Sequence, residues 1–456
     1  MRVAVLGAGL AGLTLAHALR REASRAGRPL DLEIFEAGAR AGGRIRTTED
    51  DGFRIEWAAD AFQTGSGPAL ALLRDLGLEE ERVPASPQAA RRYVFARGAL
   101  HRFPMDPVSL LRFGAVSPAG RLRLMAEPFL AGRVTQEETV HQFAARHIGE
   151  EGARVLMGAA VRGIYAGDSR ALSTDAAFPR AREMEKKHRS LVAAFVKERG
   201  KGGARKERLW SLRRGMGSLT DRLAETLAPS LRFSMPALRI SRLPEYAAPT
   251  PFTIRFANGE SRSFDAVVIA TPPADAAALL RDLDLEAAKA LREIASASVA
   301  VVAVAFRNEA FRRKPDGYGF LVAPGETLPI LGALFESNLF PERAPEGFTL
   351  VRAFLGGVDR PELVTEPDAK LAALACEALD RAIGLKSGPS RTWVMRQPNA
   401  IPQYTLGHRE RVAAVMKRIG AFPGLYVAGN AYRGVSVGSI LEDADRVAGW
   451  LMHAAR

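Results

Sequence analysis

Three glycines near the N-terminus have the spacing of a phosphate-binding loop. Gly7, Gly9 and Gly12 form the pattern G-x-G-x-x-G, between an apolar strand predicted over 2–6 and a helix predicted over 13–21. The first glycine permits a tight turn, the second lets the backbone approach a pyrophosphate, and the third lets helix and strand pack closely. Unpaired N–H groups at the helix N-terminus would then face the phosphates. This stretch therefore predicts a dinucleotide site.

A carboxylate and a second glycine turn follow the first loop. The apolar strand LDLEIFE ends in Glu36, 24 residues after Gly12, where a carboxylate can accept the ribose hydroxyls. Next come Gly42, Gly43 and Arg44, for which a plain NAD domain has no use. This G-G-R segment resembles that of FAD oxidoreductases of the amine-oxidase type, in which it contacts the FAD pyrophosphate. The resemblance implies FAD, and since no cysteine or histidine is placed for a flavin bond, we expect it to be bound non-covalently.

A loop of small residues near the C-terminus is the second predicted contact with the cofactor. In LYVAGNAYRGVSVGSILEDADRVAGWL (425–451) an apolar strand precedes the loop, and a helix follows it. The helix N-terminus would lie near N1 and O2 of the isoalloxazine ring, where it stabilises the negative charge of reduced flavin. Two loops would thus bind the two ends of one FAD. The further expected FAD contacts are Gly429, Val435, Ser436, Val437 and, from the strand-rich stretch 209–280, Leu238.

The elements that must position these loops indicate an α/β fold with several domains. We expect a discontinuous Rossmann-like FAD-binding domain made of 1–85, 206–285 and 392–456. A substrate-binding sheet domain is expected over 286–391, where the β-branched run VAVVAVAF reads as a buried strand. The segment 86–205 is expected to be a mainly helical domain that faces a membrane.

Charge and composition limit the kinds of binding partner that the chain is expected to have. The chain carries a net charge of +13, and 86–205 alone holds 21 Lys and Arg against 11 Asp and Glu. Such a segment could bind an anionic membrane or be simply a solvated surface; nucleic acid is disfavoured because no binding motif accompanies the charge. One cysteine and scattered histidines predict no metal site. No run of about 18 apolar residues exists, so we expect a cytoplasmic protein, peripheral on the inner membrane face.

Seven further stretches, in order along the whole chain, resemble the oxygen-dependent protoporphyrinogen oxidases. They are RRYVFARGALHRFP from Arg91, GIYAGDSRALSTDAAFP from Gly163, HRSL from His188, DGYGFLVAP from Asp316, AFLGG from Ala353, AIPQYTLGH from Ala400 and GNAYRGVSV from Gly429. The resemblance implies oxidation of a porphyrinogen to a porphyrin in heme biosynthesis, with protoporphyrinogen IX as the expected substrate. Oxygen is then the acceptor, and hydrogen peroxide is the by-product.

The same resemblance implies a substrate site. Arg92 matches the arginine that holds a propionate, and Gly163 matches a backbone position near the porphyrin. Tyr318 and Leu321 match apolar ring contacts, and Phe354 matches an aromatic contact across the ring. No catalytic acid or base stands out, since hydride passes to flavin N5 and the pyrrole protons can leave to solvent. Position and flavin electronics would then account for most of the catalysis.

One departure and several alternatives stay open at this point. The family commonly has Glu-x-Gly-Pro followed by Asp or Arg, whereas this chain has Glu56, Trp57, Ala58, Ala59 and Asp60. Coproporphyrinogen III is the rival substrate. A flavin amine oxidase or carotenoid desaturase is a rival enzyme class, and an FAD scaffold without turnover is the non-enzymatic reading. The sequence leaves open a homodimer, a quinone in place of oxygen, and the role of Asp60.

Overall fold

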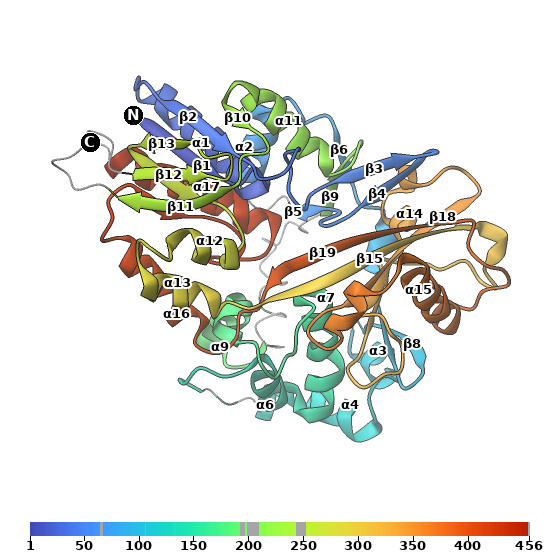
Figure 1. Ribbon diagram of the computed structural model, residues 1–456. Coiled ribbons are helices and arrows are strands. Elements are labelled where there is room, and N and C mark those ends of the chain that lie inside the picture. The colour runs from blue at the N-terminus through green and yellow to red at the C-terminus, as the bar shows by residue number, and fades with distance from the viewer. Residues whose placement is uncertain are drawn as a thin grey trace.

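The computed structural model describes residues 1–63, 67–104, 106–130, 132, 134–191, 197, 209–242 and 252–454. Within them the chain forms two large sheets and a group of helices (Figure 1). The first sheet is parallel, in the order β10-β2-β1-β14-β20, and draws its strands from both ends of the chain. Its strands are β10 (Leu231–Arg232), β2 (Asp31–Phe35), β1 (Arg2–Leu6), β14 (Ala266–Ile269) and β20 (Leu425–Val427).

Alternating side chains of β1 explain why this sheet is covered on both faces. Val3 and Val5 enter one core with helices α1 (Leu10–Arg25), α11 (Gly217–Leu227) and α17 (Val437–Ala454). Ala4 and Leu6 enter a second core with the antiparallel sheet β11-β12-β13 and helices α12, α13 and α16. These elements are β11 (Ala237–Arg242), β12 (Phe252–Phe256), β13 (Ser261–Phe264), α12 (Pro273–Leu280), α13 (Leu285–Arg292) and α16 (His408–Ile419). A strand with two buried faces reads as one apolar run, as this one does.

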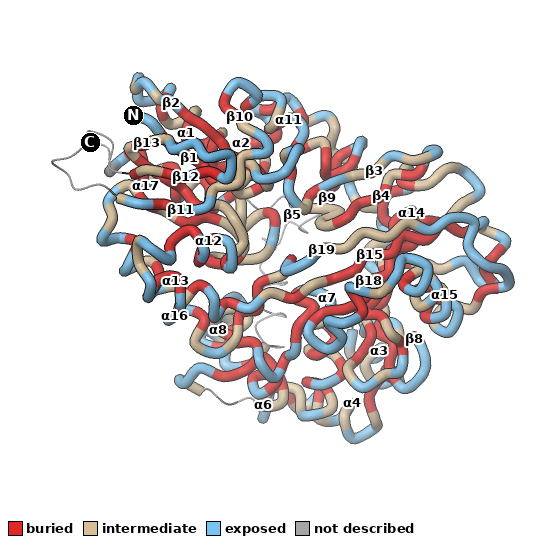
Figure 2. Tube along the Cα trace, in the orientation of Figure 1, coloured by how far each residue is buried: buried red, intermediate tan, exposed pale blue. Residues whose placement is uncertain are grey.

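The second large sheet has seven strands in the order β19-β15-β18-β17-β16-β7-β8. They are β19 (Arg391–Pro402), β15 (Ser296–Arg307), β18 (Phe348–Gly356), β17 (Gly332–Leu334), β16 (Gly319–Val322), β7 (Tyr93–Ala96) and β8 (Ala99–Arg102). Helix α15 (Asp368–Ile383) packs on one face of it. Both faces of β15 and β18 are buried along most of their length (Figure 2).

This sheet does not follow the domain boundaries expected from the sequence. Strands β7 and β8 come from 86–205, and β19 begins at Arg391 and runs into 392–456, yet all three pair within the sheet of 286–391. The pairing of β7 with β16 is parallel and joins residues more than 200 positions apart. Pairing between segments so far apart cannot be predicted from the local sequence pattern.

Most of 106–188 is helical and lies at one end of the seven-stranded sheet (Figure 1). Its helices are α3 (Pro107–Leu111), α4 (Pro118–Met125), α5 (Glu127–Leu130), α6 (Val140–Gly152), α7 (Gly158–Tyr165), α8 (Thr174–Ala177) and α9 (Pro179–His188). The remaining α-helices and strands of the described residues are α2 (Gly67–Asp75), α14 (Glu336–Leu339), β3 (Thr47–Asp50), β4 (Phe53–Glu56), β5 (Phe62–Gln63), β6 (Arg82–Pro84) and β9 (Leu209–Leu212). Over the described ranges, no helix combines the length and apolarity needed to span a membrane.

Candidate active site

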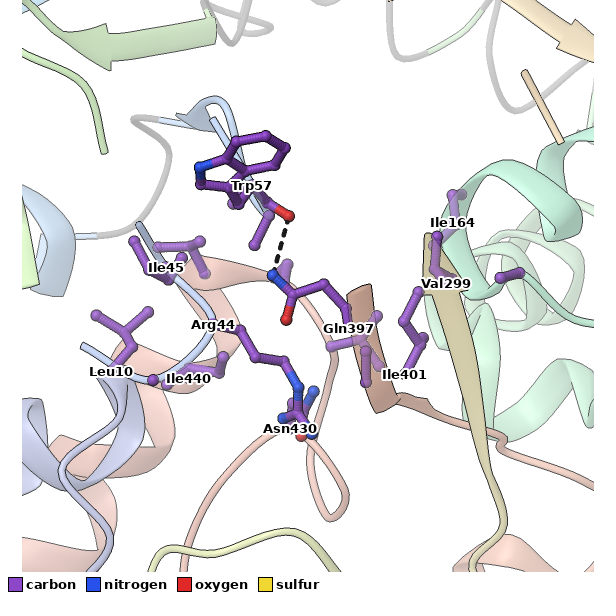
Figure 3. A pocket seen from close by; sticks show the side chains of 18 of the residues that line it. Leu10, Arg44, Ile45, Trp57, Ile164, Val299, Gln397, Ile401, Asn430 and Ile440 are labelled. Atoms are coloured by element: carbon purple, nitrogen blue, oxygen red, sulfur yellow. Dashed lines mark hydrogen bonds between the residues drawn. The ribbon is translucent and has the colours of Figure 1, made fainter. Parts of the chain in front are cut away.

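One cavity of about 1540 Å³ runs between the two sheets and reaches helix α7. Figure 3 shows part of its wall: Arg44 extends toward Asn430, while Val299 and Ile164 lie on the far side. Fourteen of the sixteen residues singled out from the sequence line it. They are Gly7, Gly9, Glu36, Gly43, Arg44, Arg92, Gly163, Tyr318, Leu321, Phe354, Gly429, Val435, Ser436 and Val437.

The first glycine loop is built as its spacing predicts. Gly7 has φ of +101°, in the region that favours glycine, and its N–H donates to the Phe35 carbonyl at 2.8 Å. Gly9 is the extended residue before α1, and no side chain caps the helix there. A Cβ on Gly9 would meet only the Gly43 Cα, at 3.8 Å, so the space above it is open. That open space beside a helix N-terminus suits a pyrophosphate.

Gly12 is one of the two predicted residues outside the cavity wall, and its role is packing. A Cβ there would lie 1.9 Å from the Gly7 carbonyl oxygen. Glycine therefore lets α1 approach the loop, as the third glycine of the pattern should.

Glu36 follows β2 and hydrogen-bonds to the first glycine turn at the nucleotide end. Its carboxylate accepts the Ala8 N–H at 2.8 Å and the Gly38 N–H at 2.9 Å, one on each oxygen. Each oxygen keeps a free lone pair, which is what two ribose hydroxyls require. The second turn lies against the first, because the Gly42 N–H donates to the Ala8 carbonyl.

The C-terminal loop is tied to the end of β19 by a residue that the sequence reasoning did not single out. The Tyr404 hydroxyl donates to the Asn430 carbonyl at 2.5 Å and accepts the Gly434 N–H at 2.9 Å. Helix α17 then begins at Val437, two residues after Val435, and the Ser436 hydroxyl accepts the Ser439 N–H. Tyr404 lies in the stretch AIPQYTLGH, so the family resemblance was the only signal for it.

Arg44 lines the cavity and extends toward Asn430 of the C-terminal loop (Figure 3). Its guanidinium donates to the Asn399 carbonyl at 2.7 Å, and burial lowers its pKa. Beside it the Gln397 amide donates to the Trp57 carbonyl at 3.2 Å, a contact drawn in Figure 3. Arg44 therefore links the second glycine turn to β19, since Asn399 belongs to that strand.

The far end of the cavity carries the residues assigned to the substrate. The Arg92 guanidinium is exposed and lies 5.1 Å from the centre of the Tyr318 ring. Across the described residues, no hydrogen bond or ion pair engages it. A Cβ on Gly163 would lie 2.4 Å from a methyl carbon of Leu321, so glycine makes room for that side chain between α7 and β16. This end offers apolar walls and one uncommitted cation.

Behind these walls lies a charged cluster that the sequence reasoning missed. Arg352 is fully buried; its Nε is 2.5 Å from Glu336 and its Nη1 donates to the carbonyls of Glu56 and Ala58 at 2.7 and 3.0 Å. Arg343 pairs with Glu56 at 2.9 Å. Burial raises the pKa of Glu56 to about 7, and it also raises that of Glu336. The only sequence signal is an arginine within the apolar run LVRAFLG.

Leu238 does not line the cavity. Its side chain is 56% exposed, whereas its neighbours Met235, Pro236 and Ala237 face the cavity. Side chains alternate along a strand, and the pairing of β11 with β12 shifts register between Ala237 and Arg239. The cavity wall thus includes the residues just before Leu238, and the assignment of Leu238 itself as an FAD contact stays a prediction.

Comparison with known proteins agrees with this architecture. A family model described as flavin containing amine oxidoreductase matches residues 10–451. The chain is 28% identical to the coproporphyrinogen III oxidase of Bacillus subtilis (strain 168), over 95% of this chain and 94% of that one. It is 31% identical to the protoporphyrinogen oxidase of Bos taurus, over 98% and 97%.

A solved structure gives the same result for the fold. A provisionally named protoporphyrinogen oxidase from Exiguobacterium sp. 255-15 superposes with a TM-score of 0.86 and 25% identity. The match covers 99% of this chain and 98% of that one.

Proposed function

Since the chain belongs to the family of flavin containing amine oxidoreductases, we propose that it oxidises protoporphyrinogen IX to protoporphyrin IX. The observation that carries the proposal is the one cavity of about 1540 Å³, which joins the glycine loops to Arg92, Tyr318 and Phe354. It exceeds the roughly 300–1,000 Å³ of a pocket for a single drug-sized ligand. A cofactor and a second large molecule can therefore lie in it side by side.

The oxidoreductase uses FAD, and the residues at one end of the cavity fit this cofactor. The open space above Gly9 and the N-terminus of α1 suit the pyrophosphate, and the free lone pairs of Glu36 suit the ribose. The N-terminus of α17, at Val437, suits the electron-rich edge of the isoalloxazine ring. Bound FAD supplies the hydride acceptor for a methylene bridge of the substrate.

The other end suits a tetrapyrrole. Tyr318, Leu321 and Phe354 provide apolar walls for its rings, and Arg92 provides a guanidinium for a propionate at the mouth. Oxygen is the proposed final acceptor, with hydrogen peroxide as the second product.

Coproporphyrinogen III is the second candidate substrate, since the Bacillus subtilis relative bears that name. It carries four propionates in place of two. The other arginine at this end, Arg162, already donates to the Val322 carbonyl and pairs with Asp359 at 3.0 Å. The wall therefore offers few free positive charges for two additional propionates, which supports protoporphyrinogen IX as the substrate.

The test is direct. The purified yellow protein is mixed in air with reduced protoporphyrinogen IX or with coproporphyrinogen III, and porphyrin fluorescence and peroxide are followed. We expect a larger kcat/KM for protoporphyrinogen. Porphyrin formation no faster than in buffer would refute the proposal, and a preference for coproporphyrinogen would assign the second candidate.

We further propose that the helical region binds an anionic membrane from the cytoplasmic side without crossing it. Large apolar side chains lie exposed there; they are Phe103, Val108, Leu111, Leu122, Met125, Phe129, Leu130 and Ile164. Phe103 and Ile164 also line the cavity, so this patch borders its mouth. An apolar substrate could pass from a bilayer into the site without entering water.

Vesicle flotation tests this surface. Phe129, which is 85% exposed, is replaced by serine, and Leu285→Ser on α13 is the control because that side chain is also exposed but outside the patch. We expect wild type and the control to float with anionic vesicles, less at high salt, and Phe129→Ser to float less. If the protein floated equally well with neutral and with anionic vesicles, the basic region would be only a solvated surface.

A homodimer stays a prediction, which light scattering can test.

A further inference from the structure

The charged cluster behind the substrate end reaches the cavity through a single side chain. Asp60 lies in the turn between β4 and β5 and lines the cavity. Its Oδ1 is 3.8 Å from the Arg352 Nη2. Its Oδ2 is buried and has no hydrogen-bond partner within the described part of the chain. Glu56, Glu336, Arg343 and Arg352 do not line the cavity.

Position distinguishes Asp60 from the other carboxylates of the cavity wall. Glu36 lies at the nucleotide end, already holding two backbone N–H groups. Asp275 lies in the first turn of α12, where its charge acts on Arg44. Asp60 instead lies beside Tyr318: its negative charge is the main reason that the pKa of the Tyr318 hydroxyl is raised.

The charges that face Asp60 come from several elements. Arg352 of β18 approaches it from behind, and Glu336 of α14 lies on the other side of that arginine. Tyr318 lies beside it, with Arg92 over the tyrosine ring. Of the two guanidiniums in this cluster, Arg343 is 2.9 Å from Glu56, and Arg352 is nearer to Glu336, at 2.5 Å, than to Asp60, at 3.8 Å, so Asp60 has no close cation of its own there.

The proposed reaction creates the charge that this site can balance. When a methylene C–H bond of the porphyrinogen breaks, the hydride takes both electrons, and the oxidised substrate is left positive. Its pyrrole N–H protons become strongly acidic as a result. Between apolar walls, where the local dielectric constant is lower than that of water, a nearby carboxylate stabilises such a cation more than it would in bulk solvent.

We propose that Asp60 is a catalytic residue that pairs with the substrate cation and accepts its pyrrole proton; this rests on the proposed function. Per cycle, one C–H bond breaks and its hydride goes to the flavin, which is reduced as the substrate is oxidised by two electrons. One N–H bond then breaks, an O–H bond forms on Asp60, and the substrate is neutral again. The carboxyl group releases its proton to solvent before the next cycle.

The test is anaerobic reduction of the FAD-loaded enzyme by protoporphyrinogen in a stopped-flow spectrometer. For Asp60→Asn we expect flavin reduction to slow by about 100-fold or more, with the half-saturating substrate concentration within threefold of wild type. Asp60→Glu should recover part of the rate. Asp359→Asn is the matched control, since this exposed carboxylate pairs with a cavity arginine but lies outside the wall.

Two readouts separate this role from a structural one. Fluorescence titration with protoporphyrin should give the same dissociation constant for Asp60→Asn and wild type. The second readout is the partial recovery of the rate in Asp60→Glu, which keeps a carboxylate where Asp60→Asn has an amide. Flavin reduction in Asp60→Asn within threefold of wild type would overturn the inference while the proposed function stands. A wild-type enzyme that porphyrinogen does not reduce would overturn both.

Discussion

Replacing Gly9 or Gly12 of the first loop with alanine adds the same methyl group at each position. We expect the Gly12 variant to lose mainly folding stability and the Gly9 variant to lose mainly FAD affinity. A Cβ on Gly12 lies 1.9 Å from the Gly7 carbonyl oxygen, whereas one on Gly9 has nothing nearer than 3.8 Å. Since Cβ contacts under 3.0 Å are essentially never seen, Gly12→Ala must push α1 and the loop apart by about 1 Å. We expect this to cost about 3 kcal/mol of folding free energy. Gly9→Ala should cost less than about 1 kcal/mol.

The effect on FAD affinity should be the reverse, with the larger loss in Gly9→Ala. The Gly9 methyl group would occupy the space assigned to the pyrophosphate and remove a charge-assisted hydrogen bond worth about 1.5–3 kcal/mol, roughly 10–150-fold in the dissociation constant. FAD-stripped wild type and both variants are compared by urea unfolding, and then titrated with FAD by flavin fluorescence. Wild-type FAD affinity in Gly9→Ala, or wild-type stability of stripped Gly12→Ala, would refute the assignment of this loop.

The remaining predictions concern the other end of the cavity. Because the Arg92 guanidinium is exposed, Arg92→Ala should reduce kcat/KM by roughly 5–30-fold, mainly through KM, with FAD content unchanged; an unchanged KM would place it outside the substrate site. Gly163→Ala should displace Leu321 and raise KM with little loss of stability, as steady-state kinetics and thermal unfolding can check. Burial raises the folded-state pKa of Glu56 from 4.5 to about 7, so the unfolded chain loses this proton first as pH rises. Wild type should therefore lose up to about 3 kcal/mol relative to Glu56→Gln between about pH 4.5 and 7, and a constant difference in free energy of unfolding would contradict this.

Local signals were sufficient to predict the strand, turn and helix of the first glycine loop. The turn at Gly7, the strand that ends before Glu36 and the helix after Gly9 each depend on residues close in sequence. The apolar run predicted as a strand is β15, which extends to Ser296 and Arg307. Here sequence patterns predict structure well because backbone conformation and side-chain alternation are set over a few residues.

Pairings between distant segments were decided only by the tertiary structure. Arg352 donates to the carbonyl of Glu56, 296 residues away, and Tyr404, which follows β19, donates to the carbonyl of Asn430. Asp60 acquires its significance from the same packing, because Arg352 lies behind it and Tyr318 beside it. The local pattern marks these residues only as charged or polar. Which charges become buried, and which carboxylate lines the cavity, depends on how the sheets pack, since burial is a property of the assembled core.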